Sequence, residues 1–386
     1  AFSVIFLGLT AGCTGMLEAN RQFILPEMSR VVYSMVILAA AVALSVRMGL
    51  MALAWGTVIG SFARLIVQLP SAVKVGNIRL TTRVNHEGVR RVGRRILPIF
   101  VAFAGMRVTF LLGNAVASGL SEGSMSGLTY AVRVMLLPVG LLALPLRTTI
   151  FPTLSHHVAE DRLELMGATA IDGMRVLAFA TIPVCVGLIL LRAPLIQVLF
   201  ERGEFDAAAT LVTASALGWF ALGLLAIGEM MIVNSVFFSL GEPMTLVKLN
   251  LANWAGCLVL SLVLVRWFGA DGVAMAISLS TTMTFVLAIL VLRHRLPTLN
   301  IQPLVETILK ATLAAGCMAG LLLGLWTLFS GAVDASGVSQ TIQSFVVVLV
   351  GGLVGACAYG LASLALQMDE ARSLLRVGMQ RIGLGS

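Results

Sequence analysis

Four polar residues lie inside long apolar stretches of this sequence, where burial costs free energy unless each finds a partner or a cavity. Arg107, with Asn114 seven residues later, lies in ILPIFVAFAGMRVTFLLGNAVASGL, and Arg133 lies in TYAVRVMLLPVGLLALP. Seven residues make nearly two helical turns, so Arg107 and Asn114 would share one helix face. Arginine presents a planar fork of donors that suits a diphosphate. These residues are therefore candidates for binding an anionic substrate in a cavity. Glu229 is the fourth of these residues.

Each arginine also has a structural interpretation, in which its long side chain reaches a lipid head group or a backbone carbonyl. For Arg147, just before the polar segment FPTLSHHVAEDR, a head-group position is favoured. Glu229 lies deep inside ALGLLAIGEMMIVNSVFF, with Asn234 nearby. Its carboxyl group either takes up a proton or a cation, or is neutral and hydrogen-bonded, and the sequence leaves both alternatives open.

Other kinds of site chemistry find no support in the sequence. The cysteines lie far apart in apolar stretches without metal-ligand spacing, so we interpret them as packing residues: Cys13, Cys185, Cys257, Cys317 and Cys357. The adjacent pair His156 and His157 would point to different faces of a helix. No glycine-rich phosphate loop, serine nucleophile motif or carboxylate pair is present. We expect no catalytic residue, no metal and no cofactor.

The elements that must position these residues are membrane-spanning helices. Hydrophobic residues make up 59% of the 386 positions and charged residues 11%, and the mean hydropathy is +1.00. Apolar stretches of roughly 18 to 25 residues recur, the length that crosses a bilayer as a helix. The sequence predicts an all-α, polytopic membrane helical bundle with about eleven spans: 2–17, 30–46, 50–69, 96–119, 126–151, 174–192, 209–239, 245–266, 272–292, 304–329 and 341–366.

The distribution of basic residues predicts the orientation of this bundle, because cytoplasmic loops carry an excess of Lys and Arg. The segment 70–95 holds seven basic residues and one acid, Glu87. Alternate loops repeat this bias, so the C-terminus is expected in the cytoplasm and residue 1 on the outer side. Residue 1 is Ala and enters an apolar run directly, which indicates a chain truncated at its N-terminus. The net charge of +8 suits loops beside anionic lipids, and the bases are too dispersed to indicate nucleic-acid binding.

Several segments resemble the MurJ (MviN) family of lipid II flippases, in the multidrug/oligosaccharidyl-lipid/polysaccharide exporter superfamily. The most specific is ASGLSEGSMSGLTYAVRVMLLPVGLLALPLRTTIFPTLSHHVAED, with its Tyr-Ala-x-Arg, Leu-Pro-x-Gly and Phe-Pro-x-Leu-Ser motifs. LMALAWGTVIGSFARLIVQLPSAVKVG, LIQVLFERGEFDAAAT, FFSLGEPMTLVKLNLAN and FGADGVAMAISLSTTMTFVL follow the family's order and spacing. Family members have fourteen spans, and this chain resembles spans four to fourteen.

The resemblance implies two lobes around a central cavity and alternating access that carries lipid II outward across the bacterial inner membrane. Residues 1–76 would be the rest of the N-lobe (three spans), 77–95 a basic cytoplasmic loop, and 96–296 the C-lobe (six spans). Residues 297–386 would hold two spans that form a groove for the lipid tail, and a cytoplasmic tail. Lipid II, an undecaprenyl-diphosphate-linked muropeptide, and membrane lipids are the implied partners, with cell-wall synthesis proteins as further candidates.

The resemblance also bears on single residues. Arg133 matches the arginine of Tyr-Ala-x-Arg, which implies contact with the substrate's diphosphate, whereas Arg107 stands where many members carry Gln. Val132, Leu136 and Ser235 replace residues that are often Asp, Glu and Arg in the family. The family's essential arginines in its first two helices fall outside this chain, so the chain by itself is not expected to transport.

Alternative functions remain at this point. An exporter of another polyprenyl-linked glycan or of a small molecule would share the architecture and differ in the cavity. A non-transporting membrane scaffold would account for the lost charges. A polyprenyl-dependent enzyme would need an acidic metal-binding motif, and the sequence holds none.

Overall fold

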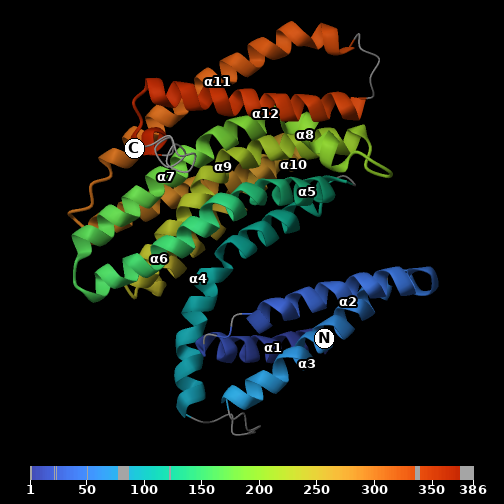
Figure 1. The fold of residues 1–386 in the computed structure, drawn as a ribbon, viewed down its shortest axis with the longest axis vertical. Helices are drawn as coiled ribbons and strands as arrows, with labels where there is room; N and C mark the ends of the chain where they lie inside the picture. Colours follow the sequence, from blue (N-terminus) through green and yellow to red (C-terminus); the bar gives the residue numbers. More distant parts are fainter. Residues whose placement is uncertain are drawn as a thin grey trace, which may run out of the picture. The chain divides into compact units, whose positions relative to one another are not determined.

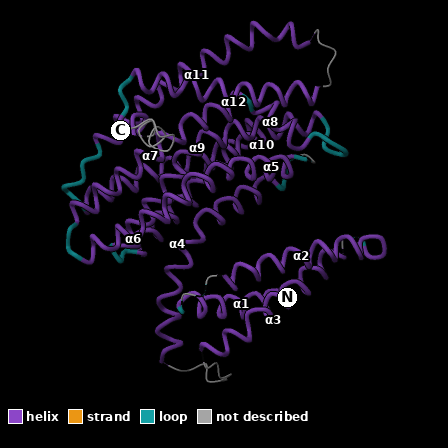
Figure 2. Tube along the Cα trace, in the orientation of Figure 1, coloured by secondary structure: helices purple, strands orange, loops and turns teal. Residues whose placement is uncertain are grey.

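The computed structural model describes residues 2–20, 22, 24–49, 51–76, 87–120, 123–334 and 340–373. All regular structure in these ranges is helical, as Figures 1 and 2 show. Two predicted features lie partly outside the described residues: the basic loop at 77–95, between 77 and 86, and the cytoplasmic tail, from 374 onward.

The described chain forms two compact units that divide near residue 90. Unit 1 contains α1 (Phe2–Ala19), α2 (Ile24–Met48) and α3 (Met51–Gly76). Unit 2 contains nearly all of α4 (Glu87–Ala117), then α5 (Ser124–Pro138), a π-helical turn η1 (Val139–Ala143), α6 (Leu144–Ala159), α7 (Leu163–Leu190), α8 (Arg192–Phe200), α9 (Ala207–Ser239), α10 (Pro243–Arg295), α11 (Gln302–Asp334) and α12 (Gln340–Ala365).

Nine helical stretches among the described residues are long and apolar enough to cross a membrane. One of them joins α5, η1 and α6, and another, α10, holds two predicted spans. The predicted fold class, an all-α polytopic membrane bundle, is confirmed. The helix that contains the predicted span 174–192 begins earlier, because α7 starts at Leu163. The first turns of α7 carry charged residues. Hydropathy assigns these residues to a loop, although they are helical.

A buried hydrogen-bond chain joins the three helices of unit 1. The Thr14 hydroxyl of α1 donates to Oε1 of Gln68 in α3, at 2.9 Å. Nε2 of Gln68 donates to the Ser29 hydroxyl of α2, at 2.6 Å. Gln68 and Ser29 are fully buried, so these bonds replace the water that their polar atoms would otherwise need.

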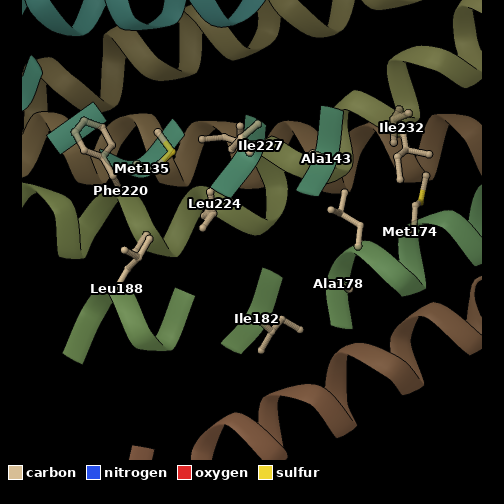
Figure 3. Close-up of a cluster of buried hydrophobic side chains, with 14 of the residues drawn as sticks. Met135, Ala143, Met174, Ala178, Ile182, Leu188, Phe220, Leu224, Ile227 and Ile232 are labelled. Atoms are coloured by element: carbon tan, nitrogen blue, oxygen red, sulfur yellow. The ribbon is translucent and has the colours of Figure 1, made fainter. Parts of the chain in front are cut away.

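The core of unit 2 is built around α9, which is apolar on nearly every side, as expected of a helix surrounded by others. Figure 3 shows its side chains Phe220, Leu224, Ile227 and Ile232 near residues of three other elements. These are Met135 of α5, Ala143 of η1, and Met174, Ala178, Ile182 and Leu188 of α7. A short helix, α8, was not among the predicted elements.

The predicted span 126–151 is a continuous helical rod with a π-helical turn in its middle. The turn begins directly after Pro138, whose ring removes a backbone donor and clashes with the preceding turn. Widening the helix by one residue relieves that clash. Arg133 lies before this turn and Arg147 after it.

The two spans predicted at 245–266 and 272–292 form a helical hairpin within α10. The chain reverses at Gly269, whose φ of 54° and ψ of −130° suit a residue without a side chain. Beside the turn, Gly272 packs so tightly on the backbone of Leu264 that a Cβ at this position would overlap it. Farther from the turn, a Cβ at Gly256 in the first half of α10 would lie 3.8 Å from Cβ of Ser280 in the second half. The two halves therefore lie side by side.

Hydrogen bonds join the last long helix, α12, to α7 and α8. The Ser344 hydroxyl of α12 donates to Oε1 of Gln197 in α8, and the Tyr359 hydroxyl donates to the backbone carbonyl of Phe179 in α7, at 2.8 Å. Figure 1 shows α11 and α12 running together beside the other helices of unit 2.

A charged cluster fastens the segment that follows α12. Arg175 of α7 pairs with Glu370 at 3.0 Å and with Asp369 at 3.5 Å. Thr307 of α11 donates to Glu370 at 3.0 Å and accepts from Nε of Arg175 at 3.1 Å. Because the Glu370 side chain is only 8% exposed, removing its partners would leave a nearly buried charge.

Candidate functional site

Arg133 lies on an exposed face of α5. Its side chain is exposed, and it forms no ion pair with another described residue. Leu137 and Leu141, one and two turns further along, are exposed on the same side. An uncovered guanidinium in an apolar helix needs water, a lipid head group or an anionic ligand beside it.

An aromatic cluster lies beside the Arg133 guanidinium. The guanidinium carbon lies 5.6 Å from the ring centroid of Tyr130, within the range of a cation–π interaction. The Tyr130 ring packs in turn on Phe200, with centroids 4.8 Å apart, and edge-on against Phe205, at 5.3 Å. Because Phe200 at the end of α8 and Phe205 in the following loop support the Tyr130 ring, the direction of Arg133 is restricted.

Arg107 of α4 is exposed, and Asn114 is half-buried two turns along the same helix. The described residues form no ion pair with Arg107. Its guanidinium therefore needs the same kinds of neighbour as that of Arg133. Both predicted arginines are exposed, on consecutive helices of unit 2.

A cavity of about 170 Å³ lies between α4, α6, α9 and both halves of α10. Its polar lining includes Thr109 of α4, Arg147 of α6 and Asn234 of α9. Arg147 was favoured at the head-group level by sequence, but it is half-buried on this lining and its Nε donates to the Ser235 hydroxyl at 3.2 Å. The structure thus brings together one predicted residue, Asn234, and one arginine that the sequence placed elsewhere.

The hairpin α10 supplies the rest of the polar lining. Asn250 and Asn253 come from its first half, and Thr281 and Thr284 from its second half. Sequence reasoning missed all four. The spacing of Asn250 and Asn253 inside an apolar span was a usable signal, because two amides three residues apart share a helix face.

A seam of hydrogen bonds along one side of the cavity holds α4 on α10. Nδ2 of Asn250 donates to the Val101 carbonyl at 3.3 Å, and Nε1 of Trp254 donates to the Gly105 carbonyl at 2.9 Å. The approach is close because residue 105 has no side chain, and a Cβ there would lie 2.5 Å from Oδ1 of Asn250. The seam sets the rotation of α4, and with it the direction of Arg107.

Glu229 and Asn234, predicted as an ion or proton site, lie in different surroundings. Asn234 lines the cavity, whereas Glu229 is absent from that lining and fully buried. On α9 the cavity-facing residues Ile227 and Met231 each lie two positions from Glu229, which therefore points to the opposite side of the helix. Neither carboxyl oxygen of Glu229 has a hydrogen-bond partner among the described residues.

We expect Glu229→Leu to stabilise the protein by about 1–2 kcal/mol, because it removes an unpartnered buried polar group at similar volume. The thermal midpoint of the purified protein in detergent measures this change. As a matched control, Glu370→Leu removes a nearly buried carboxylate that has partners, and it should lower the midpoint. A lower midpoint for Glu229→Leu would contradict the prediction and indicate a partner that the carboxyl group needs.

No group of three or more His, Cys, Asp or Glu residues in the described part of the chain could hold a metal ion. The five cysteines are free thiols there, and none lines the cavity. The polar side chains that line the cavity carry guanidinium, amide and hydroxyl groups, which bind anions and polar neutral groups by hydrogen bonds.

Comparison with known sequences matches most of the chain to one family. A family model described as lipid II flippase MurJ matches residues 1–342. The lipid II flippase MurJ of Burkholderia cenocepacia is 29% identical over 301 residues, which cover 76% of this chain and 58% of that protein. The probable lipid II flippase MurJ of Vibrio cholerae is 28% identical, over 61% of this chain and 45% of that protein. The chain spans about half the length of the curated relatives it matches.

Two solved structures share the fold. A lipid II flippase MurJ in an inward closed conformation aligns with a TM-score of 0.76 at 22% identity, covering 94% of this chain and 73% of the other. An inward-facing multidrug resistance MATE family transporter of the MOP superfamily aligns with a TM-score of 0.65 at 15% identity, covering 77% and 70%. At these identities the likeness shows the fold alone.

Proposed function

Because the chain belongs to the lipid II flippase MurJ family, and with it to the multidrug/oligosaccharidyl-lipid/polysaccharide exporter superfamily, we propose that the protein moves lipid II outward across the bacterial cytoplasmic membrane. The family is one of transporters, so its work is binding and conformational change rather than bond-breaking. The match to the family model over residues 1–342 carries the proposal. Alternating access of the two lobes is the proposed mechanism.

In this proposal Arg133 and Arg107 bind the diphosphate, and Asn114 adds a hydrogen bond. The support is that both arginine side chains are exposed and have no ion-pair partner among the described residues. A diphosphate would satisfy both, because each guanidinium can donate two parallel hydrogen bonds to neighbouring oxygens. The apolar surroundings of the two helices would strengthen these bonds.

The parts of the chain take the following roles in this proposal. Residues 1–76 belong to the N-lobe, 77–95 form a cytoplasmic loop, and 96–296 form the C-lobe. Residues 297–386 provide a groove for the polyprenyl tail and a tail in the cytoplasm. The exposed apolar side chains of α12, among them Phe345, Leu349 and Leu353, suit contact with hydrocarbon.

Complementation tests the proposed function. The full-length gene is expressed in bacteria depleted of their own lipid II flippase, and growth and the cellular level of lipid II are measured. We expect growth to be rescued and lipid II not to accumulate. Failure to rescue, with the protein detected in the membrane, would contradict the proposal.

A further inference from the structure

The closed end of the α10 hairpin carries two large aromatic side chains that are exposed. Trp267 is 81% exposed and Phe268 is 52% exposed, just before the turn at Gly269. Neither ring stacks on another aromatic ring of the described chain, and the indole N–H of Trp267 donates to no described residue. A partner that covers both rings would gain the free energy of burying them.

The tip continues an apolar surface that runs along the hairpin. Val259, Leu262 and Val263 are exposed on the turns before it, and their spacing places them on the same helix face as Trp267. Exposed apolar side chains also follow one another along the second half of the hairpin: Leu279, Met283, Val286 and Leu290. Since α10 is long and apolar enough to cross a membrane, these side chains face hydrocarbon. The aromatic tip is therefore continuous with a lipid-facing surface.

The open end of the hairpin carries basic residues instead of aromatic ones. Lys248 lies near the start of α10, and Arg293, His294 and Arg295 lie in its last turn. Arg295 pairs with Glu242 at 3.5 Å, which joins the two halves at this end. Because membrane proteins keep their excess of basic residues on the cytoplasmic side, the open end is expected there and the aromatic tip on the outer side.

The length of the hairpin matches the thickness of a bilayer. Trp267 follows Lys248 by nineteen residues, which corresponds to about 28 Å along a helix. The hydrocarbon core of a bilayer is about 30 Å thick. With Lys248 at the inner boundary of the hydrocarbon, Trp267 therefore lies at the outer boundary.

The two side chains at the tip suit the chemistry of that boundary. A tryptophan side chain has a large apolar ring and a single N–H donor, and a phenylalanine side chain has a ring alone. The head-group layer of a bilayer offers acyl chains to the ring and lipid oxygens to the N–H. A phospholipid therefore satisfies both parts of Trp267 and the ring of Phe268.

We propose that Trp267 and Phe268 anchor the closed end of the α10 hairpin in the head-group layer of the outer leaflet, and so fix the depth of this hairpin in the membrane. Asn253, on the cavity lining, precedes Trp267 by fourteen residues, which corresponds to about 21 Å along the helix. The anchor thus places this part of the cavity in the inner half of the bilayer. The inference depends on the membrane class of the protein and not on its proposed substrate.

Depth-dependent fluorescence quenching tests the anchor. Full-length wild-type protein and Trp267→Phe are reconstituted into vesicles of phosphatidylethanolamine and phosphatidylglycerol, and the difference in emission is the signal of Trp267. We expect lipids brominated near the carbonyl end of the acyl chains to quench this signal about twofold more than lipids brominated near the methyl end, because the ring lies at the boundary. Aqueous iodide should quench it only weakly.

Two further variants complete the quenching experiment. Trp254 is half-buried and donates to the Gly105 carbonyl, so the signal lost in Trp254→Phe should respond little to brominated lipids or to iodide. Phe268→Asp should raise the iodide quenching of Trp267, because a charged side chain at the tip is drawn toward water.

Cysteine labelling in spheroplasts that express the full-length protein tests the choice of leaflet. Trp267→Cys should react with a membrane-impermeant maleimide from outside, whereas Arg293→Cys should react only after the membrane is opened, each relative to the wild type. The reverse pattern would overturn the outer-leaflet assignment. A Trp267 signal that iodide quenches most strongly would place the tip in water, and one that no quencher affects would indicate a protein partner. Either result would overturn the lipid anchor.

Discussion

Arg133→Ala in the full-length gene is expected to abolish the rescue of flippase-depleted cells. The Arg133 side chain is exposed, its guanidinium is restricted in direction by Tyr130, and it has no ion-pair partner among the described residues. Two charge-assisted hydrogen bonds to a diphosphate contribute about 3–4 kcal/mol, so the loss weakens binding by roughly 10²- to 10³-fold. Growth and the level of lipid II after depletion measure the effect.

Two further variants serve as controls for Arg133→Ala. Arg133→Lys keeps the charge but cannot donate two parallel hydrogen bonds, so it should rescue growth only partly. Arg266→Ala removes an exposed arginine of α10 that lies outside the proposed site, so it should rescue like the wild type. Full rescue by Arg133→Ala at normal membrane levels would remove Arg133 from the proposed diphosphate site.

Gly272→Ala is expected to have the largest effect on folding. The added Cβ would overlap the backbone carbonyl of Leu264, and a backbone cannot rotate away as a side chain can. Relief would require the α10 hairpin to open beside its turn at Gly269. We expect a loss of about 3 kcal/mol, the upper end of overpacking costs. The thermal midpoint of the purified protein should fall by about 5 °C or more.

Gly256→Ala is the matched control in the same hairpin. Its Cβ would lie 3.8 Å from Cβ of Ser280, an ordinary van der Waals contact. Replacing a helical glycine by alanine there should leave stability unchanged or raise it by up to about 1 kcal/mol. Equal midpoints for Gly272→Ala and the wild type would contradict the tight packing of the hairpin.

The opposite effects expected at Gly272 and Gly256 could not be derived from the sequence, because both are glycines in apolar helices. The distinction depends on which backbone atoms lie opposite each residue after the hairpin closes. The positive φ of Gly269 could not be predicted from the sequence either, although hydropathy alone predicted the two spans on either side of it.

The sequence by itself determined the membrane class, the helical spans and the family. Each of these follows from local information, since hydropathy over about twenty residues and short motifs need no knowledge of distant contacts.

Only the tertiary structure decided which polar residues meet. Asn234, Asn253 and Thr284 line one cavity although they belong to different helices, and Glu229, five residues from Asn234, points away from it. Helix rotation and packing set these relations, and both arise from contacts between segments far apart in the sequence. The apolar faces of membrane helices look alike to hydropathy, because lipid and protein core are equally apolar.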